Sequence, residues 1–223
     1  MEEGLSRIKS FPSLATEASS NAASPVLTKP KSTLHGRLLQ TAVTKPVILK
    51  DGRRLTIRNY DSSDKEALVA MYAGLSPEAV RWGLPPYDRA KVERLTSNLE
   101  YKINLIALSD SRIVGHLQIY TIPMRQMNGI GELLIYLHQD FQNVGLGTAM
   151  MREGIRETRV RGWRRVRLTV VAENHRAIRS YEKVGFEREG LSRENYFGED
   201  GKYHDEVQMG LLIGPAEEGE GSE

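Results

Sequence analysis

Two glycines, Gly145 and Gly147, mark the start of a segment with helical periodicity. They follow an apolar run at 133–137 and a short polar loop, in the turn Gln142-Asn143-Val144-Gly145-Leu146-Gly147. Because glycine has no Cβ atom, a ligand can approach the backbone there closely. The unpaired N–H groups and the positive end of the helix dipole then face one point. The turn therefore predicts an anion site suited to a pyrophosphate.

The turn alone leaves three interpretations open. It can bind a pyrophosphate, it can let a helix pack tightly against a sheet, or it can belong to a dinucleotide-binding motif. A dinucleotide motif of the form G-x-G-x-x-G needs a third glycine for close helix packing, and Met150 stands at that position. The glycines also come several residues after the strand, so the dinucleotide interpretation is the least favoured.

A second motif, at 174–186, reads Asn-His-Arg-Ala-Ile-Arg-Ser-Tyr-Glu-Lys-Val-Gly-Phe, and an apolar strand separates it from the glycine turn. It resembles the N-x-x-A-x-x-x-Y-x-K-x-G-F signature of the GNAT superfamily of N-acetyltransferases. Gln142-x-x-Gly145-x-Gly147 is similar to the pyrophosphate turn of that family. The resemblance covers 132–213, and the segment 55–120 fits the family's β-α-α-β-β lead-in more loosely.

The resemblance implies an α/β fold with a GNAT-like mixed, mostly antiparallel twisted sheet of six to seven strands flanked by helices. It also implies acetyl-CoA as a cosubstrate. By position, a backbone strand at 135–137 would pair with the pantetheine arm, the turn would hold the pyrophosphate, and Asn174 would bond the pantetheine. The implied cofactor-binding residues are Ile135, Tyr136, Leu137, Gln142, Asn143, Val144, Gly145, Leu146, Gly147, Thr148, Asn174 and Tyr181.

Acetyl transfer from a thioester to an amine needs a neutral amine, donors for the developing oxyanion and a proton for the leaving thiolate. Tyr181 is the predicted acid, since the resemblance implies that it sits near the thioester sulfur. Glu132, at the start of the cofactor strand, is the predicted general base. His204 and Asp205 are weaker candidates for the acceptor pocket. An enzyme that receives its amine already neutral needs no dedicated base.

The predicted function is transfer of an acetyl group from acetyl-CoA to a primary amine by direct attack on the thioester. The acceptor stays open among a protein lysine, a protein N-terminus, an amino acid and a polyamine. The alternative class is a non-catalytic acyl-CoA-binding regulatory module, which would keep the glycine turn but lack a working acid.

Helices and strands must position these residues. Alternation and capping signals predict strands near 55–57, 103–108, 112–121, 129–137, 166–171, 186–196 and 203–212. They predict helices after Asp61 or Ser63, from Ser76, and over 89–99, 145–160 and 174–184. Residues 1–50 are rich in Ser, Thr, Ala, Pro and Lys and read as a flexible tail, with a lead-in strand at 44–49 as the exception. We expect one domain over 51–213 and an acidic tail over 214–223.

Composition excludes several classes of protein. The chain has no cysteine, which excludes disulfides, thiolate metal sites and a cysteine nucleophile. A net charge of +2 gives no reason to expect a nucleic-acid or membrane partner. The histidines lack ligand spacing, so no metal is expected. No apolar stretch reaches the roughly 20 residues of a membrane span, and we expect a cytoplasmic protein. A homodimer through the last strands stays open.

Overall fold

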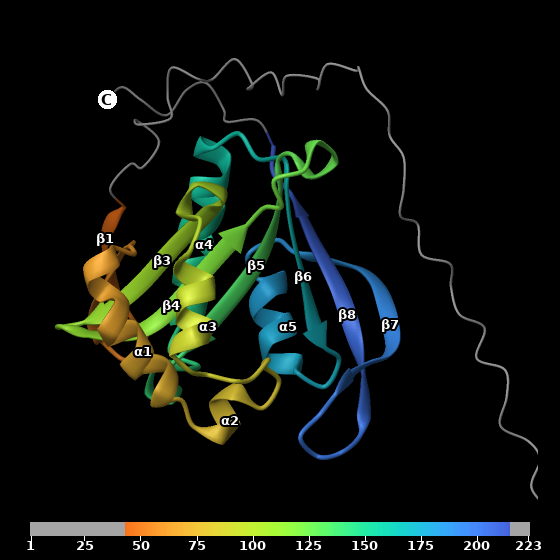
Figure 1. Cartoon of the computed structure of the whole chain (residues 1–223), viewed down its shortest axis with the longest axis horizontal. Helices are drawn as coiled ribbons and strands as arrows, with labels where there is room; N and C mark the ends of the chain where they lie inside the picture. Colours follow the sequence, from red (N-terminus) through yellow and green to blue (C-terminus); the bar gives the residue numbers. More distant parts are fainter. Residues whose placement is uncertain (1–42, 215–223) are drawn as a thin grey trace, which may run out of the picture. The chain divides into compact units, whose positions relative to one another are not determined.

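The computed structural model describes residues 43–214, and the interpretations of 1–42 and of 215–223 as tails fall outside the described residues. The described part is built on one eight-stranded sheet in the order β1-β2-β3-β4-β5-β6-β8-β7 (Figure 1). The strands are β1 (Thr44–Ile48), β2 (Arg54–Asn59), β3 (Lys102–Ser109), β4 (Arg112–Tyr120), β5 (Ile130–Leu137), β6 (Arg165–Val171), β7 (Glu187–Phe197) and β8 (Tyr203–Leu212). Of the neighbouring pairs in this sheet, β5 and β6 are parallel and the others are antiparallel.

The mixed, mostly antiparallel sheet flanked by helices is confirmed, with one strand more than the expected six to seven. The additional strand is β1, which pairs with β2 from Thr44↔Arg58 to Ile48↔Arg54. The ordered sheet therefore begins before residue 50, as the lead-in strand at 44–49 allowed. Most side chains of β1 are exposed, as expected of an edge strand, and this is why its composition resembles that of a tail.

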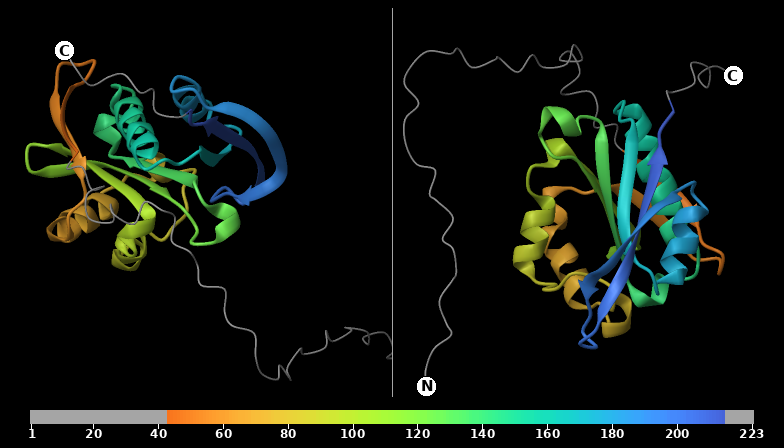
Figure 2. Two further views of the ribbon diagram at one scale, coloured as in Figure 1. Left: turned by 90° about the horizontal axis from the view of Figure 1, so that it is seen from above. Right: turned by 90° about the vertical axis from the view of Figure 1, so that its right-hand side faces the viewer.

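Five α-helices accompany the described sheet: α1 (Lys65–Ala73), α2 (Pro77–Val80), α3 (Arg89–Thr96), α4 (Leu146–Val160) and α5 (His175–Glu182). In Figure 2, α1 and α3 lie against one face of the sheet and α4 lies against the other. The predicted start of α2 at Ser76 is confirmed, because Ser76 accepts a hydrogen bond from Ala79 N there. Asn174 accepts one from Ala177 N at the start of α5.

Two apolar clusters hold these layers together. Leu68 and Met71 of α1 pack with Val92 of α3 on one face. On the other face, Met150 and Ile155 of α4 join the larger cluster, and Gly154 lets α4 approach so closely that a Cβ atom there would lie 2.9 Å from Leu117. Each fully buried side chain of this size contributes about 1.5–3 kcal/mol through burial, which fixes α4 and its N-terminal turn against β5.

The parallel pair β5–β6 separates soon after it begins. Its ladder runs from Ile130↔Arg165 to Glu132↔Arg167, whereas β4 pairs with β5 from Glu132 to Leu137. The second half of β5 therefore faces a gap on the side of β6. The described helices include no segment long and apolar enough to cross a membrane.

Candidate active site

A cavity of about 410 Å³ occupies the gap between β5 and β6. Residues 133–137 of β5 and 169–171 of β6 form its two walls, and the N-terminal turn of α4 and one side of α5 complete it. Backbone N–H and C=O groups on the gap side of β5 have left the ladder, so they are free to bond an extended ligand as a neighbouring strand would.

The glycine turn lies at one end of this cavity. Gly145 is the N-cap residue of α4 and has a φ of 94°, and Asn143 has a φ of 63°. Only glycine adopts such a conformation without a steric cost. The first helical bond runs from Ala149 N to Gly145 O, so the amides at 146–148 have no intrahelical partner. The anion site stays a prediction, and these amides are the groups it would use.

Gly147 has a packing role. A Cβ atom on it would lie 3.2 Å from Cδ1 of Leu137, so the Leu137 side chain would have to shift by a few tenths of an ångström. The interpretation of the turn as a packing device therefore holds for Gly147, while the left-handed conformation at Gly145 shapes the loop itself. One turn combines both roles.

The remaining turn residues contribute in different ways. The Gln142 side chain donates through Nε2 to Leu137 O at 3.2 Å and so ties the turn to the end of β5. Leu146 is fully buried in the core, Val144 packs against that core, and neither of these two predicted cofactor residues lines the cavity. Asn143 and Thr148 both line the cavity.

Helix α5 brings Asn174 and Tyr181 to the same cavity. Asn174 uses its Oδ1 atom to cap α5, 3.3 Å from Ala177 N, which leaves its amide N–H₂ group available. The ring of Tyr181 packs edge-on against Phe186 with centroids 5.9 Å apart. Burial, with a smaller effect of the neighbouring Tyr136, raises the pKa of Tyr181 to about 12, so its hydroxyl keeps its proton at neutral pH.

The far end of the cavity is closed by α2 and the β7–β8 hairpin. Glu78, Trp82 and Gly83 line it from the α2 side, and Glu206 lines it from β8. The Tyr196 hydroxyl donates to Gly83 O at 2.9 Å, which joins the hairpin to the segment after α2. This end has an aromatic wall and two carboxylates.

Glu132, the predicted base, does not line this cavity. Its carboxylate lies 3.5 Å from Arg167 Nη2, and it borders a separate shallow depression with Tyr120. The reason is the register, because Glu132↔Arg167 is the last pair of the β5–β6 ladder, and the gap opens only beyond it. The structure thus brings Tyr181 to the gap and leaves Glu132 in the closed part of the sheet.

His204 and Asp205 also lie outside the cavity lining. The His204 ring bonds Asp200 and Glu173 at 3.0 Å each, and hydrogen bonds to these two carboxylates raise its pKa. Its ring stands edge-on to Trp82 at 5.0 Å. His204 therefore packs behind Trp82, which lines the cavity, and Asp205 accepts from Glu194 N within the hairpin.

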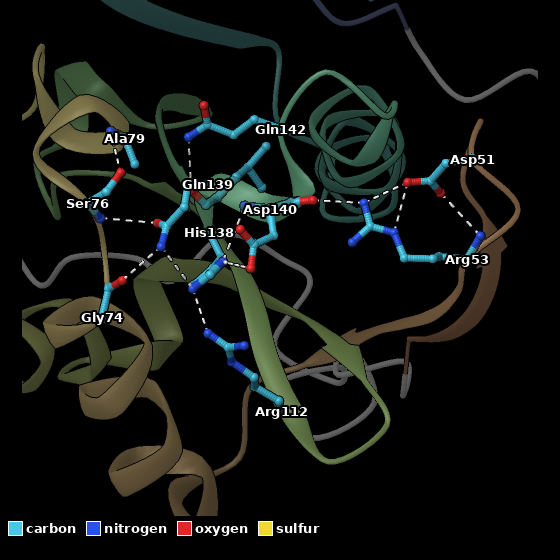
Figure 3. A network of polar contacts seen from close by, with 11 residues as sticks. Asp51, Arg53, Gly74, Ser76, Ala79, Arg112, His138, Gln139, Asp140 and Gln142 are labelled. Carbon is cyan, nitrogen blue, oxygen red and sulfur yellow. Dashed lines mark hydrogen bonds and ion pairs between the residues drawn. The ribbon is translucent and has the colours of Figure 1, made fainter.

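A polar network joins the loop before the glycine turn to two distant segments (Figure 3). Gln139 accepts from Ser76 N at 3.1 Å and donates to Gly74 O at 3.2 Å, which links the loop to the start of α2. His138, which follows the end of β5, is buried and only 4% exposed. Its Nε2 atom lies 2.5 Å from Arg112 Nη2.

Several cavity residues carry no signal in the two motifs. Lys50 lies in the turn between β1 and β2, and Glu206 lies one residue after the sequence candidates His204 and Asp205. Asp51-Gly52 between two apolar runs is a typical hairpin signal and could have brought Lys50 into the domain. The other cations that line the cavity are Arg176 and Arg179 on α5 and Lys183 directly after it.

The mixed sheet and the cavity between its two diverging strands define the class of fold. Residues 68–186 match the family model described as "Acetyltransferase (GNAT) family". The chain belongs to this family and is an N-acetyltransferase. The L-amino acid N-acetyltransferase AaaT of Escherichia coli (strain K12) is 31% identical over 159 residues, which are 70% of this chain and 96% of that protein.

Solved structures agree in fold. An acetyltransferase of the GNAT family from Streptococcus pneumoniae superposes with a TM-score of 0.62 at 27% identity, over 72% of this chain and 99% of that one. The spermidine N-acetyltransferase of Vibrio cholerae, solved in complex with CoA and spermine, superposes with a TM-score of 0.59 at 17% identity, over 71% and 95% of the two chains. The second likeness concerns the fold alone.

Proposed function

We propose that this N-acetyltransferase binds acetyl-CoA in the gap between β5 and β6 and transfers its acetyl group to a primary amine that enters beside α2. The observation that carries the proposal is the combination in one cavity of an unpaired strand edge, the Gly145 turn and the Tyr181 hydroxyl. When bound, acetyl-CoA supplies an acetyl thioester.

The residues fit that group in three places. The free backbone edge at 135–137 suits the amides of a pantetheine arm, with Asn174 as a side-chain donor. The unpaired amides at 146–148 suit a pyrophosphate. The left-handed backbone at Gly145 opens the turn without a side chain in the way. Val144 and Leu146 take part through their backbone.

The Tyr181 hydroxyl is the proposed proton donor to the leaving sulfur. Its pKa of about 12 keeps the hydroxyl protonated at neutral pH. Because a CoA thiolate is far less basic than the Tyr181 phenolate, the hydroxyl acts mainly by donating a hydrogen bond to the sulfur as negative charge develops there. A backbone N–H of the free edge near Tyr136 and Leu137 is the proposed oxyanion donor.

For the proton that leaves the amine, the cavity offers Glu78 and Glu206. The Glu206 carboxylate is oriented by Asn195 Nδ2 at 2.5 Å, and we assign it the acceptor role, directly or through water. Glu132 stays a prediction from the sequence, and the contact with Arg167 speaks against it. A cytoplasmic location and a homodimer also stay predictions.

A thiol-release assay with acetyl-CoA and a panel of amines tests the proposal. The panel contains L-amino acids, since a relative is named as an L-amino acid N-acetyltransferase. Polyamines and lysine-containing and N-terminal peptides complete it, since Glu78 and Glu206 favour a cationic acceptor at the far end. We expect release with at least one class. Binding of acetyl-CoA without thiol release for any amine, including amines from cell extract, would favour the non-catalytic acyl-CoA-binding module.

A further inference from the structure

The turn between β1 and β2 is fastened to the loop that leads into α4. Lys50 N donates to Val144 O at 3.0 Å, and Arg53 Nη2 donates to Asp140 O at 2.8 Å. The Arg53 guanidinium also lies over the ring of Phe141, 4.1 Å from its centroid. Figure 3 shows Arg53 between Asp51 and the Asp140 carbonyl. Three separate contacts therefore hold the hairpin against the glycine turn.

This docking places the Lys50 side chain beside Gly145. A Cβ atom added to Gly145 would lie 3.6 Å from Cγ and 3.8 Å from Cε of Lys50. The aliphatic part of the Lys50 side chain therefore passes alongside the N-cap residue of α4. Lys50 lines the same cavity as the turn. Its ammonium group has no ion-pair or hydrogen-bond partner among residues 43–214.

Three other lysines of the described part have partners away from the cavity, whereas Lys183 lines the cavity just after α5. Lys45 pairs with Glu153 and Lys65 pairs with Glu93. Lys102 donates to two backbone carbonyls at the end of α3. Lys50 thus carries its charge on a long, flexible stem beside the Gly145 turn.

We infer that Lys50 is a phosphate-binding residue of the cofactor site and that the β1–β2 hairpin is the device that delivers it. The inference rests on the proposed function, since the phosphate is the pyrophosphate of CoA held at the Gly145 turn. The Lys50 ammonium attracts both negatively charged phosphate groups. This attraction adds to the hydrogen bonds and the helix dipole that the backbone amides provide. Arg53 acts as a positioning residue, because its contacts go to the protein loop.

Calorimetric titration with CoA compares the wild type with Lys50→Gln and with Lys50→Arg. We expect Lys50→Gln to raise the Kd for CoA about five- to thirtyfold at low ionic strength, and Lys50→Arg to restore most of the affinity. The loss shrinks as salt is added, because screening weakens an exposed charge pair. Lys65→Gln is the control, since it removes the same charge from a lysine on α1 that lies outside the cavity lining, and it should leave the Kd unchanged.

Truncated ligands locate the phosphate that Lys50 meets. With dephospho-CoA, which lacks the 3′-phosphate, the penalty of Lys50→Gln should persist. With pantetheine, which carries no phosphate, the variant and the wild type should bind alike. Equal CoA affinities of wild type and Lys50→Gln, or a penalty that disappears with dephospho-CoA, would overturn the inference. A wild type that binds no CoA at all would overturn the proposed function instead.

Discussion

Tyr181→Phe removes one oxygen atom from the proposed acid and leaves the rest of the cavity in place. The ring keeps its contact with Phe186, and the hydroxyl has no hydrogen-bond partner among residues 43–214. The free energy of unfolding should therefore change by less than about 1 kcal/mol. A positioned general acid contributes about 10²–10⁴ in rate, so kcat should fall at least a hundredfold, which corresponds to about 2.7 kcal/mol in the barrier.

The assay follows thiol release at saturating amine and measures the Kd for CoA by calorimetry in parallel. We expect a large loss of kcat with a Kd within about threefold of the wild type, because the loss arises in the transition state. The wild-type rate should show no alkaline fall from Tyr181 below pH 10, since its pKa is raised to about 12. Tyr101→Phe, on an exposed tyrosine outside the cavity, is the control. An unchanged kcat in Tyr181→Phe would remove the residue from the mechanism.

Four further substitutions test other parts of the account. Gly145→Ala should lower the free energy of unfolding by about 1–2 kcal/mol in urea, because alanine is strained at a φ of 94°. Asp64→Asn should lower the free energy of unfolding by about 1–3 kcal/mol at pH 7, because it loses the charged hydrogen bonds to Arg58. Since Arg58 lowers the pKa of Asp64, the difference between variant and wild type should disappear gradually as the pH falls below about 4. Burial lowers the pKa of His116 to about 3, so below about pH 6.5 the unfolded chain binds a proton that the folded chain does not. The free energy of unfolding of the wild type should therefore fall by about 1.4 kcal/mol per pH unit more than that of His116→Asn. Equal pH dependence of the two free energies in urea titrations would refute this. Glu132→Gln should give a pH–rate profile that overlays the wild type, and a selective loss on the acid side would return Glu132 to the role of base.

Local signals in the sequence are sufficient for most elements. Ser76 caps α2 at its predicted start, Asn174 caps α5, and Gly162, with a φ of 68°, follows the end of α4. These features depend on residues within one turn of each other, so the chain specifies them without its tertiary context. The family motifs add the location of the anion turn and of Tyr181, which line one cavity in the structure.

Features that depend on the pairing of distant strands cannot be predicted from these local sequence signals. The sequence puts Glu132 on the cofactor strand, but only the register shows that the gap opens after the pair Glu132↔Arg167. Likewise, β1 has the composition of a tail because an edge strand buries little, and its pairing with β2 is what brings Lys50 to Gly145. Both outcomes come from contacts between segments far apart in the chain.

Amide hydrogen exchange with and without CoA tests the central claim most directly, because it reports on the backbone of the gap itself. We predict that CoA slows exchange in β5 at 133–137 and in the first turn of α4 at 146–148, with no comparable change in β2 or β3. Protection confined to other elements, or exchange at 133–137 and 146–148 that CoA leaves unchanged at saturation, would contradict the account.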